Sequence, residues 1–287
     1  MRPIALSTAI LAATTLAQKK TECADGLYMI AARGTGEDKG AGAIGEIAKG
    51  IAKRVNGSII SPLDYPATFE DPSYEDSETD GVKALSTALT DYHSSCPDGK
   101  IAVLGYSQGG QIVTDTFCGG GFVKNKPLTT SLIKDSVVAA VMFGDPSHVA
   151  NLTYDKGTSI KDGIFASNTT KLCEDNYSDI MRSYCDTGDT YCDIGNNTEV
   201  HGSYFKKYGK EVVDFVVEQY EKAIKEESTS TKTSTATATA ETSGSATSAG
   251  GETTTTAAPG NNAAAGLVPG LVLAMVPLAL AMSDFLY

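Results

Sequence analysis

Residues 100–121, KIAVLGYSQGGQIVTDTFCGGG, are the stretch that decides the fold. The apolar run Ile101–Leu104 predicts a buried strand, and apolar residues at helical spacing from Gln111 onward predict a helix. The residues between them, 105–109, form a G-x-S-x-G motif in a strand–turn–helix context. Here the motif predicts that Ser107 is a nucleophile on a sharp turn, with glycines that let two segments pass closely. The alternative is an ordinary strand–helix turn that happens to contain serine.

Further strands and helices are expected on both sides of this stretch. Apolar runs predict strands at 27–32, 58–62, 137–143 and around 180–184, and helical spacing predicts helices at 44–55, 81–93 and 204–224. Residues 64–80, rich in Pro, Tyr and acidic residues, predict a loop. The alternation indicates an α/β fold with three layers, in which helices flank a central, mostly parallel sheet of about five strands. Ligand chemistry is then expected at the carboxyl ends of the strands, where Thr35, Ser107 and Asp145 lie.

The first 17 residues have the pattern of a secretory signal peptide. Arg2 is an early cation, the segment Ile4–Leu16 is apolar, and Ala17 is a small residue at the expected cleavage site. An exported chain favours disulfides over metal ligation, and no C-x-x-C or H-E-x-x-H motif is present. We therefore expect three disulfides and neither metal nor cofactor. The six cysteines are Cys23, Cys96, Cys118, Cys173, Cys185 and Cys192.

The formal net charge of -12 restricts the partners. Such a charge argues against nucleic acid, anionic membrane surfaces and acidic polysaccharides, and favours a neutral substrate. Nothing in the sequence indicates an oligomer, so a monomer is expected. Sequons that fit a glycosylated, secreted eukaryotic protein are present at Asn56, Asn151, Asn168, Asn176 and Asn196.

The C-terminal part of the chain changes composition twice. Residues 18–227 have the composition of a globular domain, whereas 228–262 are mostly Ser, Thr, Ala and Gly and predict an O-glycosylated stalk. Residues 263–287 form an apolar tail. Small residues precede this tail and no Lys or Arg follows it, which favours a GPI-attachment signal over a transmembrane anchor. The expected location is extracellular, with membrane contact only through that lipid.

A nucleophilic serine needs a base, and three histidines are available. His93 precedes the central strand and lies at its wrong end, so we expect a structural role. His148 follows the strand at 137–143 and lies on the correct edge, which makes it the rival. His201 follows the last strand and the acidic residues, and completes the Ser, Asp, His order of an α/β-hydrolase.

The acid and the oxyanion donors are also expected near strand ends. Asp186, Asp189 and Asp193 compete as the acid; Asp189 lies between Cys185 and Cys192, a loop short enough for its cysteines to pair. The acid would hold the imidazole tautomer and stabilise the imidazolium. The oxyanion needs donors in place, and the Gln108 amide and Thr35, by its amide or hydroxyl, are the candidates. A helix cap is the structural alternative for Thr35.

Three segments of the chain resemble the fungal cutinase and acetylxylan esterase family, carbohydrate esterase family five. They are Cys96-Pro97, the G-x-S-x-G motif, and Cys185-x-x-Gly188-Asp189-x-x-Cys192 followed by a histidine. The resemblance, over about 22–225, implies a lidless α/β-hydrolase. It also implies a triad of Ser107, Asp189 and His201, an oxyanion hole from Thr35 and Gln108, and disulfides Cys23–Cys96 and Cys185–Cys192, leaving Cys118 with Cys173.

The resemblance leaves the substrate open. Cys118-Gly119-Gly120-Gly121, Gly144-Asp145-Pro146 and Tyr184-Cys185-Asp186 favour the acetylxylan esterase branch. The acidic loop at 70–80 and the long tail depart from both branches, and the loop at 33–36 mixes their features. The expected activity is hydrolysis of neutral esters in plant polymers, acetylated xylan first. The alternatives are a cutinase acting on cutin or lipid-like esters, and a wall-anchored binding protein with a vestigial esterase fold.

Overall fold

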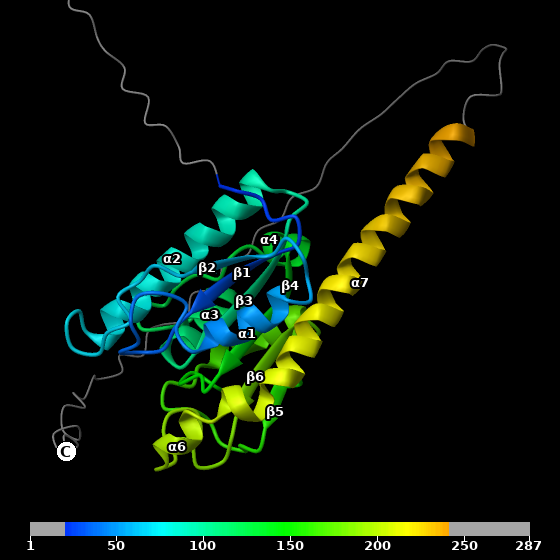
Figure 1. The fold of residues 1–287 in the computed structure, drawn as a ribbon. Helices are drawn as coiled ribbons and strands as arrows, with labels where there is room; N and C mark the ends of the chain where they lie inside the picture. The colour runs from blue at the N-terminus through cyan, green and yellow to red at the C-terminus, as the bar shows by residue number, and fades with distance from the viewer. Residues whose placement is uncertain (1–20, 241–287) are drawn as a thin grey trace, which may run out of the picture. The chain divides into compact units, whose positions relative to one another are not determined.

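The computed structural model describes residues 21–240, whose strands form a six-stranded parallel sheet in the order β2-β1-β3-β4-β6-β5 (Figure 1). The predicted parallel α/β sheet is therefore confirmed, with six strands instead of about five. The strand that was missed, β5, has three residues and is too short and polar to show a pattern. The strands are β1 Leu27–Ala32, β2 Ile59–Pro62, β3 Lys100–Tyr106, β4 Val137–Phe143, β5 Asp155–Gly157 and β6 Met181–Cys185.

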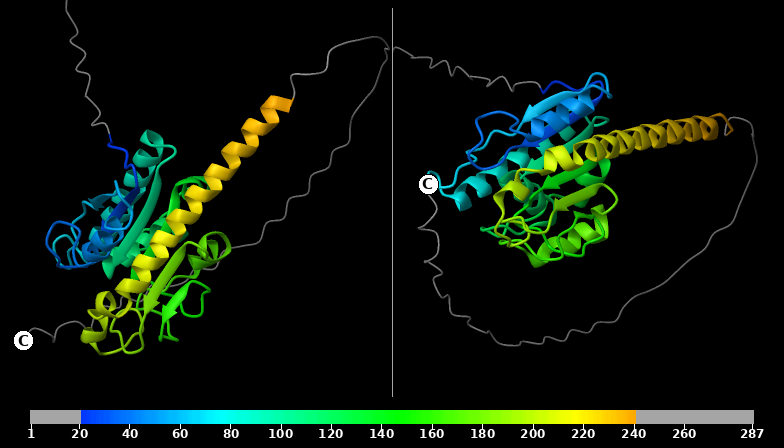
Figure 2. Two further views of the ribbon diagram at one scale, coloured as in Figure 1. Left: turned by 45° about the vertical axis from the view of Figure 1, so that its right-hand side comes forward. Right: turned by 60° about the horizontal axis from the view of Figure 1, so that its bottom comes forward.

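Helices cover both faces of the sheet, as the continuous apolar strands predict (Figures 1 and 2). Side chains alternate along each strand: Ile101 and Val103 pack in the core with α2, α3, α4 and α5, whereas Ala102 and Leu104 pack in the core with α1 and α7. The three predicted layers are thus present. The helices are α1 Ile44–Ala52, α2 Tyr74–Ser95, α3 Gln108–Cys118, α4 Thr130–Ser136, α5 Lys171–Tyr177, α6 Thr198–His201 and α7 Tyr204–Ala240, with a 3-10 turn at Asn168–Thr170.

Helix α2 corrects the prediction of a loop over 64–80 and a helix from Gly81. The helix begins at Tyr74, because the Ser73 side chain accepts a hydrogen bond from the Asp76 amide and acidic residues occupy the first turn. Its first two turns bury Glu78 and other polar residues in place of apolar ones. The apolar spacing on which the prediction depended is therefore absent there.

Two buried carboxyl groups lie between α2 and α3. Glu78 and Asp115 are 0% and 1% exposed. Burial raises the pKa of Glu78 to about 7 and that of Asp115 to about 9, and the negative charges of nearby carboxylates add to both shifts. The folded domain therefore holds protons here that the unfolded chain releases.

We expect the melting temperature to fall as the pH rises from about 5 to about 9, because carboxyls with raised pKa stabilise the fold only while protonated. Their contribution is complete below the ordinary pKa and is lost as the pH rises through the folded values. The contribution of Glu78 is lost by about pH 7 and that of Asp115 by about pH 9. Scanning calorimetry of Asp115→Asn should show a flatter dependence, and the exposed Asp91→Asn on α2 should keep the parent slope. A Tm that rises across this range would contradict the assignment.

Helix α7 is longer than predicted. It continues to Ala240 instead of ending near Ile224, so the first residues of the predicted stalk, 228–240, are helical (Figure 2). No Gly or Pro interrupts this segment, and hydroxyls of Ser228 and Thr229 bond to carbonyls one turn earlier. Within 21–240 no helix is long and apolar enough to span a membrane. The predicted signal peptide (1–17), the rest of the stalk (241–262) and the tail (263–287) lie outside the described residues.

Three disulfides are present in the described domain. They join Cys23 to Cys96 and Cys185 to Cys192, the pairs that the resemblance implied, and Cys118 to Cys173, the pair that was expected by elimination. The first ties the start of the domain to the end of α2, the second ties the end of α3 to α5, and the third closes the loop after β6. The last loop carries Asp189, and its closure restricts where that side chain lies.

Candidate active site

Ser107 lies on a sharp turn between β3 and α3, at the carboxyl edge of the sheet. Its backbone has φ 54° and ψ −120°, a conformation that costs energy for a residue with a side chain. A Cβ on Gly105 would lie 2.3 Å from the Gly109 carbonyl oxygen, and one on Gly109 would lie 2.1 Å from the Ala32 oxygen. Both glycines of the motif are therefore required by close backbone approach.

His201 ends helix α6 and faces the serine. Its Nε2 lies 2.9 Å from Ser107 Oγ, and the residue is only 7% exposed. The ring packs over Gly144, where a Cβ would lie 2.7 Å from His201 Cε1. Because Gly144 also has φ 59°, only glycine fits this position without strain.

Asp189 holds the other side of the imidazole. Its Oδ2 lies 2.9 Å from His201 Nδ1, and its Oδ1 accepts hydrogen bonds from the Tyr191 and Cys192 amides at 2.7 and 3.1 Å. Burial alone would raise the pKa of Asp189, but His201 and the Tyr204 hydroxyl hold that pKa below its ordinary value. An ionised carboxylate accepts only, so Nδ1 carries the proton and Nε2 is free to accept the serine hydroxyl.

The two rival acids shape the loop and do not contact His201. Asp186 accepts hydrogen bonds from Lys207 and Tyr208 of α7 at 2.7 and 2.8 Å. Asp193 accepts from the Gly188 amide at 2.7 Å. Asp189 is therefore the member of the three that meets the imidazole.

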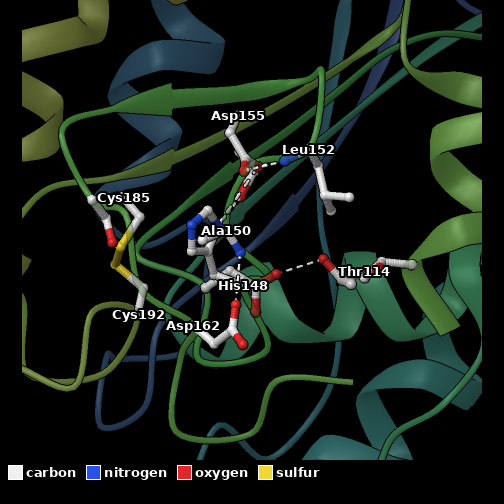
Figure 3. A network of polar contacts seen from close by, with 12 residues as sticks. Thr114, His148, Ala150, Leu152, Asp155, Asp162, Cys185 and Cys192 are labelled. Carbon is white, nitrogen blue, oxygen red and sulfur yellow. Dashed lines mark hydrogen bonds and ion pairs between the residues drawn. A yellow bond between two sulfur atoms is a disulfide. The ribbon is translucent and has the colours of Figure 1, made fainter. Parts of the chain in front are cut away.

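The other two histidines make different contacts. His93 Nδ1 lies 2.6 Å from Ser136 Oγ, at the amino edge of the sheet. His148 is 3% exposed, with its Nδ1 3.2 Å from Ser183 Oγ and 3.7 Å from Asp155 (Figure 3). Burial lowers the pKa of His148 to about 4. The rival base is thus a neutral, buried histidine beside β5 and β6 and not a residue of the acid loop, the segment 186–193 that carries Asp189.

Of the two residues predicted for the oxyanion hole, Gln108 follows the serine in sequence, and Thr35 follows Gly34, where a Cβ would lie 3.4 Å from Ser107 Cβ. Gln108 begins α3, so its amide has no acceptor within the helix. Its buried side chain bonds to Ser77 of α2 and to two carbonyls, which fixes the turn. Thr35 is half-buried and makes no hydrogen bond with any residue in 21–240. A pair of free donors on the strand exits can stabilise an oxyanion.

Two residues that sequence reasoning missed brace the Thr35 loop. The Arg33 guanidinium donates to the carbonyls of Leu63, Tyr65 and Pro66. Glu37 accepts from the Gly34 amide at 2.6 Å and from the Ala43 amide at 2.8 Å. No sequence pattern marks either residue as a brace. The carbonyls that Arg33 binds lie about 30 residues away in sequence, so the contact depends on the folded chain.

Three aromatic side chains pack together beside Gln111, on the first turn of α3. Tyr74 donates to Gln111 Oε1 at 2.9 Å, and its ring lies 5.6 Å from Phe165 and 6.0 Å from Phe122. A cavity of about 520 Å³ opens beside these rings. Its lining combines two aromatic rings with amide and hydroxyl groups: Gln111, Gly121, Phe122, Phe165, Ala166, Ser167 and Asn168.

No group of three or more His, Cys, Asp or Glu side chains within 21–240 is placed to hold a metal ion. A larger cavity, of about 730 Å³, lies near Lys100 and Val137, where β3 and β4 begin. That is the amino edge of the sheet, opposite Ser107. The larger volume therefore has no part in the arrangement around the serine.

Comparisons with known proteins cover this part of the chain. The family model described as Cutinase matches residues 23–220. An acetylxylan esterase of Hypocrea jecorina is 30% identical over 211 residues, 70% of this chain and 68% of the relative. Cutinase 11 of Verticillium dahliae is 32% identical over 201 residues, 66% of this chain and 67% of the relative. The solved catalytic core domain of acetyl xylan esterase from Trichoderma reesei is 31% identical with a TM-score of 0.64, covering 69% of this chain and 100% of that one.

Proposed function

Because this chain belongs to the cutinase family of carboxylic ester hydrolases, we propose that it is a secreted serine esterase whose triad is Ser107, His201 and Asp189. The observation that carries the proposal is the pair of 2.9 Å contacts that join serine to imidazole and imidazole to carboxylate. This is the arrangement by which a base activates a serine hydroxyl. A vestigial fold used only for binding has no need of it.

The reaction proceeds through a covalent acyl-enzyme. Ser107 Oγ attacks the ester carbonyl while His201 Nε2 takes its proton. The Gln108 amide and Thr35 donate to the oxyanion of the tetrahedral intermediate. His201 then gives the proton to the leaving alcohol oxygen, and the C–O bond breaks. Water then attacks the acyl carbonyl while the same nitrogen takes its proton, the bond from that carbon to Ser107 Oγ breaks, and His201 returns the proton to Oγ, which frees the acid and regenerates the serine.

The substrate that we propose is an acetyl ester on a neutral polymer, acetylated xylan first. Tyr191 supports a short acyl group, since its ring lies 4.6 Å from the His201 ring and occupies space beside the reacting atoms. Two of the similar proteins are named acetylxylan esterases. The net charge of -12 is compatible with a neutral polymer and unfavourable for an acidic one.

Cutin or lipid-like esters are the second candidate. Phe69 and Ile194 are 54% and 59% exposed. Phe69 follows Thr68, whose carbonyl accepts a hydrogen bond from the Gln108 side chain, and Ile194 follows the last residue of the acid loop. Exposed apolar side chains of this kind would bind long acyl chains. A relative named cutinase has the same level of identity to this chain as the acetylxylan esterases.

Rates on esters from acetyl to long acyl chains, with acetylated xylan alongside, separate the two candidates. We expect the highest kcat/KM on acetyl esters and release of acetate from xylan, because the Tyr191 ring occupies space beside the His201 ring. A kcat/KM that increases with chain length would make cutin-like esters the substrate. No hydrolysis of any ester would favour the anchored binding protein.

Phe165→Ala should weaken binding of the polymer selectively. Loss of one stacking surface for a sugar ring, about 1 kcal/mol, corresponds to a roughly fivefold higher KM on acetylated xylan. The KM on a small acetate ester should not change, because that molecule does not reach the cavity beside Phe165. Ile160→Ala, at an exposed residue outside the cavity, is the matched control. Equal losses on both substrates would mean that Phe165 supports the fold of the site instead.

Extracellular location fits the described domain, since three disulfides are typical of proteins from oxidising compartments. We propose that the protein is exported and attached to the cell surface by a GPI lipid, on the sequence pattern of residues 1–17 and 263–287. The mass of the mature C-terminal peptide tests the attachment, and a peptide that ends at Tyr287 would contradict it.

A further inference from the structure

We propose that Tyr204 is a positioning residue that shares the Asp189 carboxylate with His201 and thereby sets both the orientation of the imidazole and how tightly it holds a proton. The inference rests on the proposed function, because it assigns a role within the same triad. In the sequence, Tyr204 is only the first residue of the last amphipathic helix.

The hydroxyl of Tyr204 has two possible acceptors for its proton, Asp189 Oδ2 and, at 3.3 Å, the disulfide sulfur of Cys192. It lies 2.6 Å from Asp189 Oδ2, the oxygen that also faces His201 Nδ1. It also accepts a hydrogen bond from the Asp186 amide at 3.0 Å. That amide can only donate, and a charged carboxylate at 2.6 Å is a much stronger acceptor than a disulfide sulfur at 3.3 Å, so the hydroxyl proton points to Asp189. Oδ2 therefore receives two donors, one from the imidazole and one from the phenol.

The phenol ring is fixed in place. Tyr204 is 0% exposed, and its ring stacks on Phe143 with centroids 5.7 Å apart and planes 11° apart. A Cβ on Gly144 would meet Tyr204 at 3.1 Å as well as His201 at 2.7 Å, so both rings pack on the same glycine backbone. Buried rings without free space keep one rotamer. The hydroxyl thus holds the carboxylate in the plane that suits Nδ1.

The backbone couples the two donors. His201 ends α6 and Tyr204 begins α7, with only Gly202 and Ser203 between them. The Ser203 amide and hydroxyl both donate to the Val200 carbonyl, which makes the connection a closed turn. Both side chains therefore approach Asp189 from one rigid unit, and neither moves without the other.

A second donor on Oδ2 also changes the electrostatics of the pair. Each hydrogen bond to the carboxylate disperses its negative charge and weakens the hold of that oxygen on an imidazolium. The Tyr204 hydroxyl is one of the groups that lower the pKa of Asp189. Burial raises the pKa of Tyr204 far above its ordinary value, so the hydroxyl keeps its proton under working conditions.

Other titratable groups lie around this pair. The Asp186 carboxylate is held by Lys207 and Tyr208. Burial raises the pKa of Tyr106 to about 12 and lowers that of His148 to about 4, so both remain neutral. The facing groups come from β3, the segment after β4, the acid loop and α7: Tyr106, His148, Asp186, Tyr191, Lys207 and Tyr208.

The test is Tyr204→Phe in the full chain, which removes one hydroxyl and keeps the ring. We expect kcat/KM on an acetyl ester to fall by about tenfold or more, because a hydrogen bond to a charged group is lost. We also expect the acid limb of the kcat/KM profile, which reports the free enzyme, to move up by about half a pH unit. Without the Tyr204 hydroxyl, the Asp189 carboxylate keeps its full negative charge, and that charge favours the protonated form of the His201 imidazole.

Tyr208→Phe is the matched control, one helical turn later, since its hydroxyl bonds to Asp186 and does not touch Asp189. Tyr208→Phe should leave the acid limb of the kcat/KM profile at the same pH as in the parent. The double variant Tyr204→Phe with Asp189→Asn should lose no more activity than Asp189→Asn alone. An unmoved limb, or losses that multiply, would overturn the role of Tyr204. Full activity in Ser107→Ala would instead overturn the proposed function.

Discussion

Replacement of Ser107 by alanine is expected to lower kcat for ester hydrolysis by roughly 10⁴-fold or more, the scale on which a serine nucleophile contributes. No other hydroxyl lies within hydrogen-bond distance of His201 Nε2 among the described residues. The fold should be retained, because alanine removes only one oxygen from a half-buried side chain and takes no apolar group out of the core.

The matched control is Ser94→Ala, on the exposed face of α2, where the hydroxyl bonds only to the Thr90 carbonyl. It should keep the parent rate. Melting temperatures of the two variants should agree with the parent within a few degrees, which separates lost chemistry from lost folding. A Ser107→Ala protein with parent activity would remove the serine from the reaction.

Asp189→Asn is expected to reduce kcat by about 10³- to 10⁴-fold. Asparagine can still accept from the Tyr191 and Cys192 amides, so the loop should keep its shape. Its amide cannot stabilise the imidazolium, and an NH₂ group that faces Nδ1 favours the tautomer that leaves Nε2 protonated and unable to take the serine proton.

Steady-state rates on an acetyl ester measure this loss, with Asp91→Asn on α2 as an exposed control. A residual activity within a few-fold of the parent would mean that Asp189 is only a loop residue. Asp186 or Asp193 would then need to be examined as the acid.

The sequence was sufficient for the central part of the fold, because its signals there are local. The apolar runs of β1, β3 and β4 and the glycines of the G-x-S-x-G turn follow from backbone sterics and burial, which neighbouring residues determine. Helix α2 was predicted too short because Glu78 and its neighbours are buried polar residues. Strand β5 was missed because it has only three residues.

The site residues were harder to predict, because which histidine and which acid serve Ser107 depends on contacts between segments that are far apart in the sequence. His148 and His201 both follow strands at the correct edge, and what separates them is that His201 contacts Ser107 whereas His148 contacts Ser183. In the sequence, Tyr204 fits the apolar face of α7 like any other buried aromatic residue, so the pattern does not reveal the role of its hydroxyl. Its bond to Asp189 becomes visible only when the acid loop and the helix start are placed together.

The raised pKa values of Glu78 and Asp115 could not be predicted either. In the sequence, Glu78 belongs to an acidic stretch that resembles solvated loop, and Asp115 lies on an ordinary helix. Tertiary packing buries the two together, and burial is what shifts a carboxyl pKa upward.

The most direct test of the central claim is covalent trapping of the nucleophile. The protein is treated with a serine-directed phosphonate, and the modified peptide is located by mass spectrometry. We predict one label per chain, on Ser107, with loss of esterase activity in proportion to labelling and no label on Ser107→Ala. A label on another residue, or full loss of activity with Ser107 unmodified, would contradict the account.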